Sequence, residues 1–129
     1  MNKILIVNSN YYKRISNNLV KNAHKKLILY KTSIKKIDVP GVFEIPIAIR
    51  KNIEKFDAFV ALGCVIKGQT PHFDFISQAT TNAIMDLSVN SKKPIGNGII
   101  TCLNMKQAIA RKNKGAEAAN AVISILSQK

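Results

Sequence analysis

The chain has 129 residues, of which 47% are hydrophobic, and 20 lysines and arginines against seven acidic residues give it a formal net charge of +13. This length and this apolar content predict one folded domain, residues 1–129, with a real core. They exclude a disordered chain, and no apolar run reaches the roughly 18 residues of a membrane span. We therefore expect no membrane partner.

The N-terminal residues "MNKILIVNSN" carry one lysine and a short apolar run, and no small-residue cleavage site follows. A secretory signal needs such a site, so this segment predicts a first β-strand. We expect a cytoplasmic protein.

Strand-like and helix-like segments alternate from this point. Residues 3–7 predict a strand, residues 15–26 carry apolar side chains at helical spacing, and a second strand lies within 31–39. Residues 44–55 predict a helix with Pro46 in its first turn, where proline is tolerated.

The second half of the chain continues the alternation. Residues 57–66 are almost continuously apolar, which is typical of a strand buried on both faces. Residues 73–90 predict a long helix, 95–103 a fourth strand, and 105–112 and 115–127 two closing helices.

Four strands alternating with helices predict a parallel sheet covered on both faces. The expected fold is a flavodoxin-like three-layer α/β/α sandwich with a four-stranded parallel sheet. In such sheets ligands bind beyond the carboxyl ends of the strands. The segments "NSNYY", "VPGVFE", "KGQTPH" and "TCLN" follow the four strands in turn, so we expect them to meet at one rim of the sheet.

The stretch "GCVIKGQTPHFD", residues 63–74, holds one of only two histidines in the chain. Thr70 followed by Pro71 predicts a helix start, with the threonine hydroxyl as N-cap and the proline at the first helical position. Gly68 lets this turn approach a ligand, and its free amides suit an anion such as phosphate. His72 would then lie at the mouth of an anion site. A plain capped turn with an exposed histidine explains the same residues.

Three other segments at the predicted rim have two interpretations each. In "VPGVFEIP", Gly41 turns the chain and Glu44 opens a helix, where a carboxylate also complements the helix dipole. Tyr11 and Tyr12 offer flat rings for stacking on a heterocycle, or they cap the core. Arg111 suits bidentate phosphate binding, although a cation is favoured at any helix C-terminus.

The remaining polar chemistry is sparse. Cys64 and Cys102 fit neither a zinc spacing nor a disulfide framework and are expected to be small buried hydrophobic residues. The acidic residues are scattered and the two histidines are far apart in the sequence, so we expect no metal site. His24 lies among lysines on a helix face and is expected to be solvated.

The positive charge raises the question of nucleic acid. It comes from 17 lysines and three arginines in a chain also rich in asparagine and isoleucine, all of which except arginine have A/T-rich codons. No array of stacking aromatics accompanies it. A solvated lysine-rich surface is therefore favoured over nucleic-acid binding.

Together, "VPGVFEIP", "ALGCVIKGQTPHFDFI", "NGIIT" and "QAIAR…NKGAEAA" resemble the lumazine synthases, the penultimate enzymes of riboflavin biosynthesis, in order over nearly the whole chain. The resemblance implies a transferase that condenses 5-amino-6-(D-ribitylamino)uracil with 3,4-dihydroxy-2-butanone 4-phosphate, with no metal or organic cofactor. It also implies a homo-oligomer, a pentamer or an assembly of pentamers, in which a neighbouring subunit completes the pocket.

The resemblance also implies roles for individual residues. His72 falls on the position that transfers protons, Gln69 and Thr70 on the phosphate-binding turn beside Gly68, and Arg111 on the phosphate arginine. Contacts to the pyrimidine and ribityl chain fall on a larger set: Tyr11, Val42, Phe43, Glu44, Cys64, Val65, Ile66 and Asn97. Lys114 matches a ligand-contacting lysine.

Two departures from the family pattern bear on the pocket. Asn97 stands where the family usually has a large aromatic residue, after Gly96, and the connection from Arg111 to the "NKG" motif is short. A non-catalytic flavodoxin-like ligand-binding or shell scaffold is the alternative that the loss of this aromatic supports.

Overall fold

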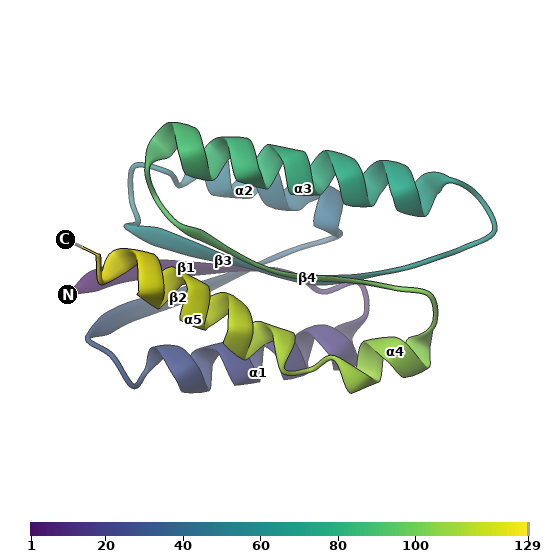
Figure 1. Ribbon diagram of the computed structural model, residues 1–129, viewed down its shortest axis with the longest axis horizontal. Coiled ribbons are helices and arrows are strands. Elements are labelled where there is room, and N and C mark those ends of the chain that lie inside the picture. The colour runs from purple at the N-terminus through teal and green to yellow at the C-terminus, as the bar shows by residue number, and fades with distance from the viewer. Residues whose placement is uncertain (129) are drawn as a thin grey trace.

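The computed structural model describes residues 1–128. A sheet of four parallel strands, in the order β2-β1-β3-β4, lies between two layers of helices (Figure 1). The strands are β1 (Asn2–Ser9), β2 (Thr32–Val39), β3 (Ala58–Ile66) and β4 (Ile95–Cys102). This arrangement confirms the predicted flavodoxin-like three-layer fold.

The helices divide between the two faces of the sheet (Figure 1). One layer contains α1 (Lys13–Leu27), α4 (Met105–Ala110) and α5 (Lys114–Leu126). The other contains the 3₁₀ turn η1 (Val42–Glu44) with α2 (Ile45–Lys51) and α3 (His72–Ser91). No helix among residues 1–128 has both the length and the apolar character to cross a lipid bilayer.

The two faces of the sheet carry separate cores because side chains alternate along each strand. From β1, Ile4 and Ile6 pack with the α1 and α5 side, whereas Leu5 and Val7 pack with the α2 and α3 side. β3 is buried along almost its whole length, as its apolar run predicted, because it lies between β1 and β4 with helices on both faces. β4 lies at the edge of the sheet.

The predicted helix over residues 44–55 is wrong at both ends. The chain first makes the 3₁₀ turn Val42–Glu44, and α2 begins at Ile45 with Pro46 in its first turn. α2 then ends at Lys51 because the side-chain amide of Asn52 donates to the carbonyl of Ala48 at 2.8 Å. That side chain replaces the backbone N–H that would have continued the helix, a competition that asparagine often wins.

α3 begins at His72, one residue before the predicted range 73–90, but its N-cap lies one residue later than the predicted Thr70. Pro71 is the N-cap, and its carbonyl accepts from the backbone N–H groups of Asp74 and Phe75 at 3.1 and 3.2 Å. The Thr70 hydroxyl accepts a long bond of 3.4 Å from the backbone N–H of His72. The threonine thus supports the first turn from outside the helix and does not act as its N-cap.

Candidate functional site

The carboxyl ends of β1, β2 and β3 open into a hollow of about 690 Å³, which we call the strand-end hollow. These ends lie at the right of Figure 1, where the connection from β3 to α3 extends beyond the sheet. Eight of the predicted site residues line the hollow: Tyr11, Val42, Phe43, Glu44, Cys64, Val65, Ile66 and His72. Its position is the one expected of a ligand site in a parallel sheet.

The two tyrosines after β1 have different environments. Tyr12 is half-buried against the core on the α1 side, and burial, followed by the neighbouring Tyr11 and Cys64, raises the pKa of its hydroxyl. Tyr11 is 73% exposed and meets Tyr12 edge to face, with ring centroids 4.9 Å apart. Tyr12 therefore caps the core, and the ring of Tyr11 remains free to stack on a ligand.

The 3₁₀ turn after β2 supplies one wall of the hollow. Val42 is buried against the sheet, whereas Phe43 is 60% exposed and Glu44 is half-buried. Within residues 1–128, no hydrogen bond or ion pair engages the Glu44 carboxylate. Its oxygens are therefore available to accept hydrogen bonds from hydroxyl groups of a ligand.

Cys64 contributes an apolar surface to the floor. Burial, and then the neighbouring Cys102, raises the pKa of its thiol from 9.0 to about 12. Both cysteines are free and buried, as predicted. A thiol held protonated in this way is a poor nucleophile, so its contribution is packing.

His72 is exposed at the first position of α3 and reaches the hollow from the α2 and α3 side of the sheet. Gln69 and Thr70 precede it in an exposed turn and do not line the hollow. A side chain at Gly68 would meet no atom within 4 Å. The turn is therefore open to solvent in the isolated chain, with room for an anion beside it.

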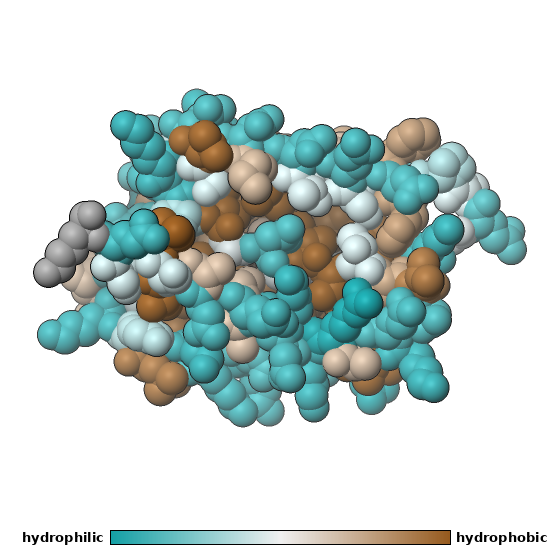
Figure 2. All heavy atoms as spheres, in the orientation of Figure 1, coloured by the Kyte–Doolittle hydropathy of each residue, from teal (hydrophilic) through white to brown (hydrophobic). Residues whose placement is uncertain are grey.

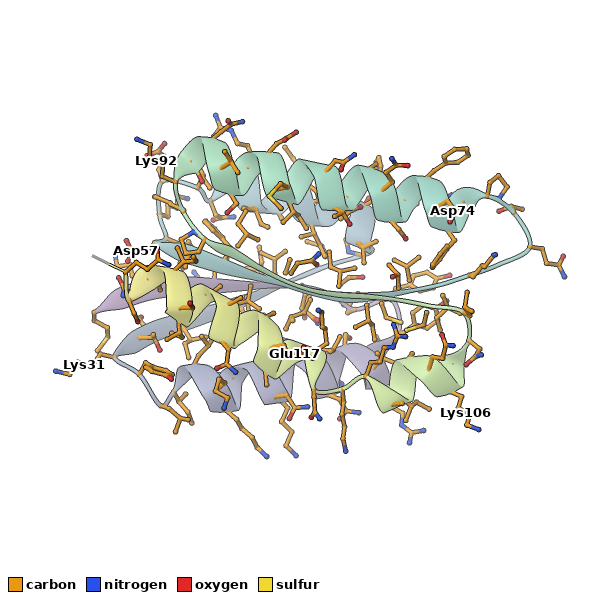
Figure 3. The ribbon with its side chains drawn as sticks, in the orientation of Figure 1. Lys31, Asp57, Asp74, Lys92, Lys106 and Glu117 are labelled. Atoms are coloured by element: carbon orange, nitrogen blue, oxygen red, sulfur yellow. The ribbon has the colours of Figure 1, made fainter. Side chains whose placement is uncertain are left out.

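Arg111, Asn97 and Lys114 line a second hollow of about 570 Å³, which we call the edge hollow. It lies along the outer edge of β4, beside α5 and the end of α4. Figure 3 labels Glu117, which also lines it, on α5. The isolated chain thus places Arg111 and His72 in different hollows, on opposite faces of the sheet, and does not bring them together.

Two of these residues cover the exposed edge of β4. The Asn97 side-chain oxygen accepts from the backbone N–H of Ile99 at 3.1 Å, and the Arg111 guanidinium donates to the carbonyl of Thr101 at 3.3 Å. Edge strands present such unpaired groups. Asn97 is therefore held against its own strand, whereas Arg111 keeps further N–H groups free for an anion.

A capping pair that the sequence reading missed positions Arg111. Asn104 caps α4 by accepting from the backbone N–H of Gln107 at 2.9 Å, and the Gln107 side chain accepts from the backbone N–H of Leu103 at 2.8 Å. The N-x-x-Q spacing resembles a capping box and could have revealed it. Arg111 then follows as the C-cap of α4.

The strand-end hollow also contains residues that were not predicted as site residues: Ser9, Pro40, Gly41 and Ile76. Ile76 lies one helical turn after His72, so helical spacing was the available signal for it. No cluster of three or more histidine, cysteine, aspartate or glutamate side chains suited to a metal ion occurs among residues 1–128.

Comparison with known proteins indicates the family of the chain. A family model described as 6,7-dimethyl-8-ribityllumazine synthase matches residues 1–129. A protein of that name from Bartonella tribocorum is 42% identical over 134 aligned residues, which cover 98% of this chain and 89% of the relative. Two further proteins of the same name are each 40% identical to this chain. The alignment with the one from Methylorubrum populi covers 98% of this chain and 82% of the relative, and that with the one from Campylobacter jejuni subsp. doylei covers 97% and 88%.

Proposed function

Because the chain belongs to the 6,7-dimethyl-8-ribityllumazine synthase family, we propose that it condenses 5-amino-6-(D-ribitylamino)uracil with 3,4-dihydroxy-2-butanone 4-phosphate. The products are 6,7-dimethyl-8-ribityllumazine, inorganic phosphate and water, and the enzyme acts in riboflavin biosynthesis in the cytoplasm. The observation that carries the proposal is the strand-end hollow, because the motifs that resemble the family converge there from three separate strand ends.

Each group in the hollow has a role that its surroundings support. The exposed ring of Tyr11 stacks on the pyrimidine, and the unpaired Glu44 carboxylate accepts from ribityl hydroxyls. Val42, Phe43 and the strand residues Cys64–Ile66 enclose the rest of that substrate. Stacking and apolar enclosure with a few polar contacts are typical of small-molecule sites.

His72 transfers protons in this proposal. The substrate amine attacks the ketone carbonyl, which loses water to give an imine. Removal of the proton from the hydroxyl-bearing carbon next to the imine then expels the phosphate with its bonding electron pair and leaves an enol. The enol becomes a carbonyl, and the ribitylamino nitrogen attacks that carbonyl with loss of a second water to close the ring. Each step moves protons, and an imidazole can donate and accept them near neutral pH. The turn of Gly68, Gln69 and Thr70 beside His72 binds the phosphate.

Arg111 completes the phosphate site from a second copy of the chain. The separation of the two hollows supports this assignment, since Arg111 and His72 do not meet in one chain. A ring of copies in which the edge hollow of one faces the strand-end hollow of the next would join them. We propose a homopentamer of this head-to-tail kind, with Asn97 and Lys114 on the same contributed wall.

Exposed apolar side chains on the α3 and β4 side support such an assembly. Phe75, Met85 and Val89 on α3 are 68%, 61% and 66% exposed, and Ile125 on α5 is 49% exposed. Figure 2 shows apolar residues gathered between the two helical layers on this side. Groups of exposed apolar side chains of this kind are typical of contact surfaces.

The direct test is incubation of the purified protein with both substrates. We expect the fluorescence of the lumazine product to appear together with inorganic phosphate, and neither when one substrate is omitted. Absence of product at substrate saturation would favour the non-catalytic binder instead, to which the fixed, small Asn97 at the wall lends support.

A mixing experiment tests the shared site separately. His72→Ala and Arg111→Ala each damage a different hollow, so co-refolded mixtures regain intact sites wherever an undamaged strand-end hollow faces an undamaged edge hollow. In an equal mixture, each of the two hollows at a site is undamaged half of the time, so random assembly of a ring leaves about a quarter of the sites intact. Activity of the mixture no greater than the mean of the two single variants would show that both residues act within one chain.

A further inference from the structure

The positive charge is concentrated on one layer of the fold. α1 carries five lysines and arginines and no acidic residue, and residues 105–126 add four with the single acid Glu117. In contrast, the 20-residue α3 in the other layer has no lysine or arginine and two aspartates. A codon bias acts on every exposed helical position, so it does not explain this division.

The basic residues of this layer lie on neighbouring elements. We define the basic face by six exposed residues of α1, α4 and the α4–α5 connection: Lys13, Arg14, Lys21, Lys25, Lys106 and Lys112. α1 and the α4–α5 connection are joined by a hydrogen bond from the Asn22 side chain to the carbonyl of Lys112 at 3.0 Å. In Figure 3, long side chains ending in nitrogen project from this layer, away from the sheet.

The geometry of α1 suits a phosphate chain. Arg14, Lys21 and Lys25 are spaced as a stripe along one side of the helix, and at 1.5 Å per residue they span about 16 Å. Asn17 and Asn18 lie between them and are also exposed. Amide and basic side chains in such an array contact phosphate and sugar oxygens.

From these observations we propose that the basic face binds the phosphodiester backbone of nucleic acid without sequence selectivity. A membrane surface fits less well, because a helix lying on lipid inserts its apolar face. The apolar side of α1, with Ile15, Leu19, Ala23 and Leu27, is buried in the core. Because the six residues that define the face include no aromatic side chain, contacts to bases play no part and affinity depends on charge alone.

The test is fluorescence anisotropy with a labelled single-stranded RNA of mixed sequence, titrated between about 50 and 200 mM KCl. Four to six phosphate contacts give a slope of log K against log salt between about −3 and −4, since each contact contributes about −0.7. The triple variant Arg14→Gln, Lys21→Gln and Lys25→Gln should reduce the steepness by about 2 and weaken binding roughly 100-fold at 0.1 M salt.

The opposite layer provides a control with the same change in charge. Arg50, Lys51 and Lys55 are exposed at the end of α2 and just after it, and replacing all three by glutamine again removes one arginine and two lysines. This control should bind RNA within about threefold of wild type, since its residues lie outside the basic face. Both variants should unfold at the wild-type temperature, because glutamine has nearly the helix propensity of lysine and arginine.

Three results would overturn the proposal: no binding by the wild type at the lowest salt, equal losses in both triple variants, or equal competition by polyglutamate, which is a polyanion without phosphate. Tighter binding to vesicles containing phosphatidylglycerol than to RNA would assign the face to membranes instead. Lumazine formation should be unchanged in both triple variants, so the outcome is independent of the proposed enzymatic function.

Discussion

Gly63 on β3 packs against two residues that line the strand-end hollow, Val42 and Ser9. A change at Gly63 should therefore affect both the stability of the fold and ligand binding. A Cβ atom at this position would lie 2.7 Å from Cγ1 of Val42 and 3.0 Å from Cβ of Ser9. Carbon atoms in ordinary contact are about 3.5–4.0 Å apart, so Gly63→Ala requires Val42 to retreat by about 1 Å. Val42 and Ser9 are 6% and 1% exposed, which leaves little room for that movement.

The expected loss of stability follows from two opposing effects. Overpacking a core costs about 1–3 kcal/mol, whereas replacing a glycine within a regular element by alanine returns about 0.5–1 kcal/mol. We therefore expect Gly63→Ala to lower the free energy of unfolding by about 1–2 kcal/mol. Gly68→Ala is the control for this measurement. A Cβ there meets nothing within 4 Å, so its stability should change by no more than about 0.5 kcal/mol.

The same displacement should weaken ligand binding. Val42 begins η1, which continues through Phe43 and Glu44 on the wall of the hollow. A shift of about 1 Å in positioning groups can lower a reaction rate by up to about 100-fold. We expect the same misplacement to weaken affinity for the lumazine product at least about tenfold.

Urea denaturation followed by circular dichroism measures the stability, and a fluorescence titration measures the affinity under conditions where the variant is fully folded. Wild-type values for both would refute the reasoning, because they would mean that Val42 moves without disturbing either the sheet or η1.

Three further predictions concern the chemistry of the site. His72→Ala should lower kcat without abolishing turnover, since positioning of two substrates alone can supply about 7–11 kcal/mol; loss of all detectable turnover would contradict this role. Arg111→Ala should raise KM for the butanone phosphate with little effect on KM for the pyrimidine, and an unchanged butanone-phosphate KM would remove Arg111 from the phosphate site. Cys64 should react with iodoacetamide at pH 8 at least about 100-fold more slowly in the folded protein than in urea, because a pKa raised from 9.0 to about 12 leaves about a thousandth of the usual thiolate. Peptide mass spectrometry would distinguish its reaction from that of Cys102.

The raised pKa of Cys64 also sets the sign of its effect on stability at high pH. The unfolded chain loses this proton near pH 9, whereas the folded chain retains it to about pH 12. Stability from this group is therefore complete below about pH 9 and decreases as the pH rises toward 12. In the folded protein at neutral pH the thiol is uncharged, which agrees with its packing role in the floor of the hollow.

Local patterns in the sequence were sufficient to predict the alternation of strands and helices, the buried central strand at residues 57–66 and the convergence of three of the four strand-end segments; the segment after the fourth strand does not join them. These features depend on apolar periodicity and on glycine and proline near each position, which act over a few residues. The errors at Thr70 and in the helix predicted over 44–55 arose from single hydrogen bonds. Pro71 provides the first helical carbonyl, and the Asn52 side chain ends α2 by bonding to Ala48.

The order of the strands in space was decided only by the tertiary structure. Because β4 lies at the edge of the sheet, Asn97 and Arg111 bond to the backbone of that edge, and Arg111 lines a different hollow from His72. The pairing of α1 with α5 likewise brought lysines about 90 positions apart onto one face. Such placements depend on which elements pack together over long sequence separations, and no local run of residues specifies that.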